Sequence, residues 1–314
     1  MKQLDLEALY ADRETVRAML AHLGDEDPIG RLSFGSRLAA IEAEIQCLAG
    51  KQETYGSVAL LFTGQPVHGS RSIAADFATS VLKSFQDLVT KQIASEEFGR
   101  LGARGRLPER TPSTLAIREL VRGSVGFVLE EQSANADLAD TPIKKAIDDV
   151  TSIISQAAAE SDEQFEASVE TLDPRILVSL RDFFHALDDG GAAVRIVEET
   201  RDESLDAQAV HRERVRVDAT DVRDIESDTV VGELLGLLPD SRRFEMKLTN
   251  TGEVIRGSVA LALASKWLEL IERPEEKLVG RVWRTKMKIR EIRERNRPPR
   301  NLYTLLGLVE PRSE

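Results

Sequence analysis

The chain has 314 residues, of which 41% are apolar and 31% are charged, and its formal net charge is −12 at pH 7. This composition is typical of globular domains with a generous charged surface, and the length allows for two or three domains. A single cysteine excludes an internal disulfide, and 5% aromatic residues mean that the cores consist mainly of Leu, Val, Ile and Ala.

The N-terminal residues MKQLDLEALYADRE alternate charge with leucine, which is not the pattern of a signal peptide. No apolar run approaches the ~20 residues that span a bilayer. We therefore expect a soluble, cytoplasmic protein that does not contact membranes. Its Arg- and Ala-rich, Lys-poor usage is typical of a bacterium with a high-GC genome.

Apolar residues recur at helical spacing over residues 4–22 and again over 31–48, with a break at Gly24 and the following DEDPIG. This pattern predicts a helical hairpin over 1–50, used for packing within the chain or against a second copy or another protein. Cys47 lies on the second apolar pattern, where we expect a small buried side chain.

The segment 51–220 is predicted to be a central α+β domain. Short β-prone runs bounded by glycines indicate strands, and amphipathic runs with a period near 3.6 indicate helices. We expect strands at 58–62, at 114–131 (two strands around a turn near Gly123) and at 192–200, and helices from Ser72 onward and at 141–159, 161–188 and 204–217.

The segment 228–311 is predicted to fold as a small β-barrel. We expect strands at 228–239, 243–249, 253–259, 278–292 and 302–309, with a helix at 260–272 between the third and fourth. This order resembles the five-stranded OB-type barrel, although a small SH3-like barrel has a similar strand count. The predicted fold class is thus α+β: a helical hairpin, a mixed central region and an OB-like barrel.

Positive charge gathers near the C-terminus. Between Lys277 and Arg300 the sequence holds ten basic and two acidic residues, so this segment carries +8 and the remainder −20. Alternation along the predicted fourth strand aligns four cations on one face, about 7 Å apart, close to the phosphate spacing of an extended single strand. Those four are Arg284, Lys286, Lys288 and Arg290.

The loops on either side of the expected oligonucleotide groove add more cations, and we expect the two loops to lie close together. The predicted nucleic-acid site therefore also contains Arg242, Arg243, Arg293, Arg295, Arg297 and Arg300. Phe244 and Trp283 follow a core pattern, which leaves Tyr303 as the ring that could stack a base.

Two structural explanations of the basic strand stay open. Lysines and arginines on a strand are commonly a solvated face or a protection against edge-to-edge aggregation. The basic face could also pair with the acidic remainder, within one chain or between copies.

A second candidate site is an anion-binding loop at the start of a helix, formed by His68, Ser70, Arg71 and Ser72. Helix N-terminal amides beside an arginine can hold a phosphate. An ordinary N-cap at Ser70 or Ser72 explains the same residues. An enzyme site around His68 and Arg71 is the least supported of three functional hypotheses.

The sequence predicts no catalytic residue, no metal site and no cofactor, because the four histidines are scattered and no paired acids stand out. The leading hypothesis is a non-enzymatic nucleic-acid-binding protein. The alternative is an assembly component of a bacterial complex, regulatory or defence-related, in which the hairpin docks a protein partner or a second copy and the basic barrel meets an acidic protein surface.

Overall fold

The computed structural model describes residues 1–23, 27–51, 53–69, 72–99, 101, 105–107, 113–121, 125–132, 139–158, 165, 169–199, 201–238, 241–260, 263–264, 278–294 and 298–309. The chain separates into two compact units, Met1–Val217 and Asp218–Glu314. The division into 1–50, 51–220 and 228–311 stays a prediction.

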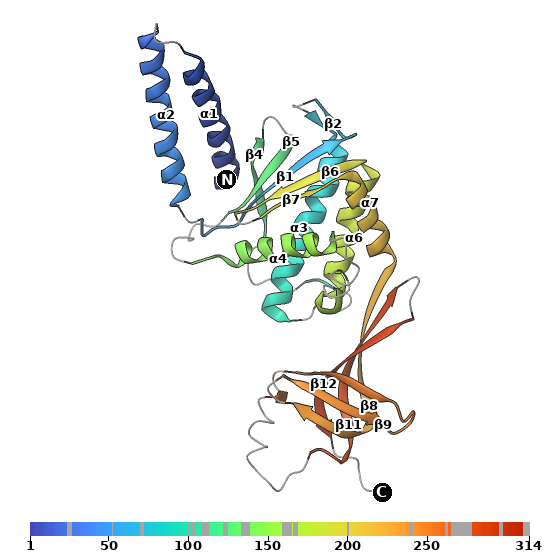
Figure 1. Ribbon diagram of the computed structural model, residues 1–314. Coiled ribbons are helices and arrows are strands. Elements are labelled where there is room, and N and C mark those ends of the chain that lie inside the picture. Colours follow the sequence, from blue (N-terminus) through green and yellow to red (C-terminus); the bar gives the residue numbers. More distant parts are fainter. Residues whose placement is uncertain are drawn as a thin grey trace. The chain divides into compact units, whose positions relative to one another are not determined.

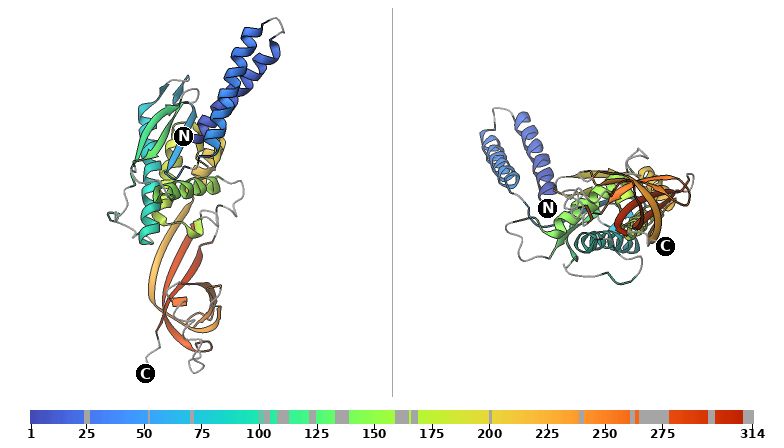
Figure 2. Two further views of the ribbon diagram at one scale, coloured as in Figure 1. Left: turned by 90° about the vertical axis from the view of Figure 1, so that its left-hand side faces the viewer. Right: turned by 90° about the horizontal axis from the view of Figure 1, so that it is seen from below.

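The first unit begins with the predicted helical pair, α1 (Lys2–His22) and α2 (Pro28–Ala49), which run side by side in Figures 1 and 2. Asp27 starts α2: its carboxylate accepts a hydrogen bond from the Gly30 amide at 2.8 Å, and Pro28 occupies the first helical turn. The expectation that Cys47 is buried is wrong, since its side chain is exposed.

A five-stranded antiparallel sheet forms the centre of the first unit. Its strands are β1 (Ser57–Gly64), β4 (Leu115–Val121), β5 (Val125–Glu131), β6 (Ala192–Val197) and β7 (Asp202–Leu205), in the order β4-β5-β1-β6-β7. The short strand β7 was not predicted, because its sequence DESL is acidic and lacks β-branched residues.

The sheet is covered by the helices α3 (Ala75–Phe98), α4 (Pro142–Ala157) and α6 (Pro174–Asp189). Helix α7 (Ala207–Asp218) follows later in the chain. Successive residues of β1 point to opposite faces, so Phe62 meets Phe77 of α3 edge-on at 5.3 Å while Leu61 joins a cluster closed by Met1 and Leu4. Both faces of the central strand are therefore buried.

The second unit is a closed barrel of five strands. They are β8 (Thr220–Leu238), β9 (Arg243–Leu248), β10 (Val254–Val259), β11 (Val282–Glu294) and β12 (Arg300–Val309), paired around the barrel in the order β10-β12-β11-β8-β9. Only β10 and β12 are parallel. The helix expected at 260–272 falls mostly outside the described residues; of those described, Leu263 and Ala264 are helical.

The barrel interior is filled by the residues that alternation predicts, and Phe244 and Trp283 are confirmed as core residues with 2% and 7% exposure. Closure brings β10 and β12 close enough to require glycine. A Cβ atom on Gly257 would lie 2.1 Å from the carbonyl oxygen of Tyr303.

No helix among the residues that the structure describes is long and apolar enough to cross a membrane.

Glu213 on α7 is an acid in the interior of the first unit. Its side chain has 0% exposure, and Oε1 accepts from Arg216 at 3.0 Å while Oε2 has no hydrogen-bond partner among the described residues. Burial raises the pKa of Glu213 to about 7, although Arg216 and Arg212 act to lower it. In the folded protein, the ionised form of the Glu213 carboxyl group is thus less favourable than in water.

We expect the first unit to lose stability as the pH rises from about 4.5 to about 7, because the folded state binds this proton more tightly than the unfolded chain. The raised pKa corresponds to an upper bound of about 3 kcal/mol. Glu213→Gln should therefore stabilise the unit at pH 8 and change little at pH 5. Urea unfolding followed by the helical circular dichroism signal measures this, and an effect equal at both pH values would contradict it.

Candidate functional site

The predicted row of cations lies on β11, between β8 and β12. Arg284 and Lys286 are exposed and Lys288 is half-buried, but Arg290 has only 2% exposure. The second half of the row is therefore not available to a phosphate backbone, because Lys288 is partly buried and Arg290 is buried.

Opposite charges face each other across β8 and β11. Strand β8 begins at Thr220, eight residues before the predicted start, and this added half is rich in acids. Every charged residue of β11 from 288 to 293 lies directly opposite a residue of opposite charge, and we call these four pairs the charge ladder: Lys288 and Glu226, Arg290 and Asp224, Glu291 and Arg223, Arg293 and Asp221.

The strongest contact of the charge ladder is the fork between Arg290 and Asp224. Arg290 Nε donates to Asp224 Oδ1 at 2.9 Å and Nη2 donates to Oδ2 at 3.2 Å. Lys288 Nζ approaches the same carboxylate at 3.4 Å. A bidentate fork that holds a buried arginine on a partly exposed carboxylate is a structural contact, and it removes Arg290 from the surface that could meet a nucleic acid.

The two loops expected to flank one groove lie at opposite ends of β8. Glu294, before the loop between β11 and β12, pairs with Thr220, whereas Arg243, after the loop between β8 and β9, pairs with Leu238. Figure 1 shows β11 and β12 continuing past the barrel as a ribbon. The predicted proximity of these loops is thus wrong, because β8 is longer than the sequence pattern indicated.

The remaining predicted residues divide into three groups. Arg242 and Arg243 are exposed, and Arg242 adopts a positive φ of 52° in its turn. Arg293 is exposed and donates to Glu291 at 2.9 Å, and Arg300 is half-buried. Arg295 and Arg297 lie outside the described residues.

Tyr303 is half-buried and lines a hollow of about 560 Å³ in the barrel. Its ring packs against the barrel core, and its hydroxyl lies 3.5 Å from the Asn301 amide. The hollow is lined by Thr229, Val230, Val231, Leu248, Thr249, Asn250, Ile289 and Tyr303. Tyr303 therefore combines a core contact with one accessible edge.

The second unit as a whole is nearly neutral. Residues 218–314 contain 18 Lys and Arg against 17 Asp and Glu, so the unit carries +1 and the first unit −13. The +8 segment is balanced by acids elsewhere in the unit, and those that face it across the sheet, Asp221, Asp224 and Glu226, lie some 60 residues earlier on β8.

The two described residues of the predicted anion site, His68 and Ser72, lie before α3 and not in its first turn. His68 belongs to β2 (Val67–His68) and Ser72 to β3 (Ser72–Ile73), and the Ser72 hydroxyl donates to the His68 carbonyl at 2.9 Å. Helix α3 begins at Ala75 with Ala74 as its N-cap residue, so Ser72 is not the cap. Ser70 and Arg71 lie outside the described residues.

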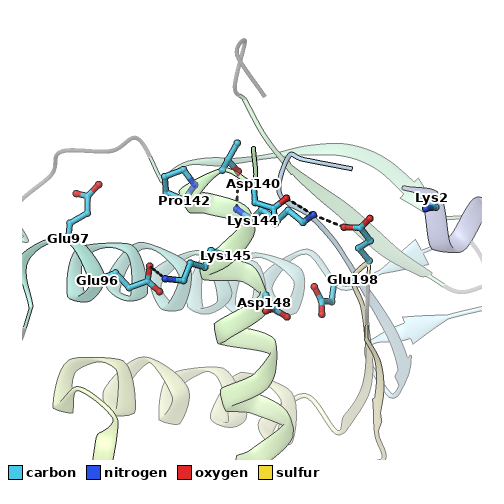
Figure 3. A pocket seen from close by; sticks show the side chains of 11 residues that line it. Lys2, Glu96, Glu97, Asp140, Pro142, Lys144, Lys145, Asp148 and Glu198 are labelled. Carbon is cyan, nitrogen blue, oxygen red and sulfur yellow. Dashed lines mark hydrogen bonds and ion pairs between the residues drawn. The ribbon is translucent and has the colours of Figure 1, made fainter. Parts of the chain in front are cut away.

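The first unit contains a polar pocket of about 900 Å³ that sequence reasoning missed (Figure 3). Its lining combines six carboxylates with three lysines, which come from α1, α3, α4, the residues just before α4 and the segment after β6: Lys2, Glu96, Glu97, Asp140, Lys144, Lys145, Asp148, Glu198 and Glu199. Lys144 bridges Asp140 at 3.0 Å and Glu199 at 2.6 Å. No local sequence spacing could have joined residues this far apart.

A pair of carboxyl groups lies at the edge of this pocket. Gln92 Nε2 donates to Glu96 at 3.0 Å and to Asp149 at 3.1 Å. Burial, helped by the adjacent Glu96, raises the pKa of Asp149 to about 6. Burial acts in the same sense on Glu96, but hydrogen bonds with Asp149 and Gln92 hold its pKa below the ordinary value.

Asp149 accordingly keeps its proton up to about pH 6 beside the ionised Glu96. Across the part of the chain that the structure describes, no three His, Cys, Asp or Glu side chains are placed to hold a metal ion.

We expect Asp224→Ala to destabilise the barrel by about 3 kcal/mol, because Arg290 stays buried after losing its carboxylate partner. The matched control is Glu226→Ala, which removes a contact 3.9 Å from Lys286 between side chains that are 57% and 64% exposed and should cost under about 0.5 kcal/mol. Both tryptophans of the chain, Trp267 and Trp283, belong to the second unit, so fluorescence-detected urea unfolding measures the difference. Glu226 belongs to the charge ladder but makes only an exposed contact, so equal effects of the two substitutions would contradict a structural role for the fork between Arg290 and Asp224.

No protein-family model, curated protein or solved structure matches the chain. Its function must therefore be argued from its own residues.

Proposed function

We propose that the protein is a non-enzymatic assembly component whose helical hairpin docks a protein partner. The observation that carries the proposal is that α2 has apolar side chains on two opposite faces. The inner face, which contacts α1, contains Phe34, Leu38, Ile41 and Ile45. The outer stripe, on the opposite side by helical spacing, contains Ile29, Leu32, Ser36, Ala39, Ala40, Ala43 and Cys47.

The outer stripe is uncovered in the single chain. Ile29 and Leu32 are 80% and 78% exposed, values at which a large aliphatic side chain gains nothing from folding. A helix with apolar side chains on two opposite faces is normally covered on both. The stripe therefore supports a docking role for α2.

The hairpin buries few side chains for the length of its two helices. Helices of 21 and 22 residues bury only Val16, Ile41 and Ile45 fully among the described residues. Ion pairs between Arg37 and Asp12 at 2.9 Å and between Arg17 and Glu42 at 2.8 Å hold α1 against α2. Such a pair of helices gains stability when a partner covers a second face.

We expect the purified protein to associate as its concentration rises from about 1 to about 100 µM, because the exposed stripe is apolar. Leu32→Asp should abolish the association by placing a charge in it. The matched control, Ala18→Asp, changes an exposed position on the far side of α1 and should leave the association intact. Sedimentation velocity measures all three proteins; a wild-type monomer at every concentration would rule out self-association through the outer stripe.

A second candidate, nucleic-acid binding by the barrel, has its own support. We infer that the barrel is of the OB type, because its third strand pairs with its fifth in parallel and its first strand pairs with its second and fourth. Four predicted cations lie outside the charge ladder on exposed positions: Arg242, Arg243, Arg284 and Lys286.

On this hypothesis, we expect single-stranded oligonucleotides to bind more weakly as salt rises, because each phosphate contact releases counterions. Replacing both Arg242 and Arg243 by Gln should reduce the slope of log K against log salt by roughly 1 to 2. The control is Arg256→Gln, since Arg256 already donates to Glu245 at 2.6 Å. Fluorescence anisotropy at several salt concentrations measures the slope. An affinity that does not change with salt concentration would refute nucleic-acid binding by the barrel.

A further inference from the structure

We infer that the partner of the outer stripe is a second copy of this chain, with the two α2 helices packed antiparallel about a two-fold axis near Ala40. The inference rests on the proposed assembly function and adds the identity and geometry of the partner. Three features of α2 carry it: the sizes of its outer side chains, the charges on one edge, and its length.

Side-chain size changes along the stripe. Its N-terminal part carries the bulky Ile29 and Leu32, whereas its middle and C-terminal part carries small side chains up to Cys47. A parallel pair would set bulky against bulky at one end and leave a gap at the other. An antiparallel pair sets Leu32 against Cys47 of the partner copy, which keeps the two helix axes equally close along their length.

The charges beside the stripe favour the same arrangement. Arg37 and Glu44 are seven residues, or two turns, apart on one edge of α2, and Arg37, which is still 57% exposed, also pairs with Asp12 of α1. Antiparallel pairing about Ala40 brings each Arg37 to the Glu44 of the other copy, twice per dimer. Parallel pairing would place this edge of the two helices on opposite flanks of the contact, so Arg37 and Glu44 would not meet across it. Two-fold symmetry thus makes this surface complementary to itself.

The length of α2 sets the strength of the contact. A helix of 22 residues is about 33 Å long and about 10 Å wide, so the face offers on the order of 300 Å² per copy. Stable complexes bury about 800 Å² per partner, so we expect a reversible, concentration-dependent dimer.

The test is disulfide trapping. Ala40→Cys places a thiol beside the proposed axis, where two Cα atoms can come within the ~7 Å that a disulfide requires. The wild type is the matched control, because its single cysteine, Cys47, is on the same stripe but about 20 Å from its counterpart in the antiparallel pair. Both proteins are oxidised with diamide and run on a non-reducing gel, after circular dichroism has checked that the variant is folded.

We expect at least about tenfold more cross-linked dimer from Ala40→Cys than from the wild type, and loss of that excess when Leu32→Asp is added. A wild-type dimer linked through Cys47 would indicate parallel helices and overturn the inference. So would cross-linking that survives Leu32→Asp, since it would come from random collision. If Ala40→Cys does not cross-link while the wild type still sediments as a Leu32-dependent dimer, the geometry is wrong and the assembly function stands. A wild type that stays monomeric refutes the second copy as the partner.

Discussion

The fork between Arg290 and Asp224 fixes how β8 and β11 pair, and the second unit depends on that pairing. Cross-strand pairs of opposite charge stabilise a register, and like charges directly opposite each other destabilise it. A slip of two residues in one direction would place Glu291 opposite Asp221, and a slip in the other would place Arg293 opposite Arg223. The observed register is the one that avoids both contacts.

This constraint changes the meaning of the basic strand. Arg290 and Lys288 would attract a polyanion if they were free, but both contact Asp224 across the two strands, in a unit whose net charge is +1. The barrel core alone could not define the register there, because β8 before residue 228 contributes few apolar side chains to it. Electrostatic pairing takes over where apolar alternation is weak.

The first unit uses charge in a related way, while its hairpin leaves an apolar surface uncovered. Lys144 and Lys145 lie among the carboxylates of the pocket and offset part of their repulsion. The outer stripe of α2 has no such compensation within the chain, and the cost of its exposure to water is the physical reason to expect a partner. We assign structural roles to the charged groups that are paired within the chain. We assign the outer stripe of α2, which is exposed in the single chain, to assembly.

Local patterns in the sequence determined the helical pair, most strands of the sheet and all five strands of the barrel, because periods of 3.6 and 2 reflect which side chains face a core. The sequence also placed Phe244 and Trp283 correctly. It could not reveal the early start of β8, the burial of Arg290, the exposure of Cys47 or the acidic pocket. Each of these depends on residues far apart in the chain, such as Asp224 and Arg290, and only the tertiary structure decides whether a charge meets water, a ligand or a partner of opposite sign.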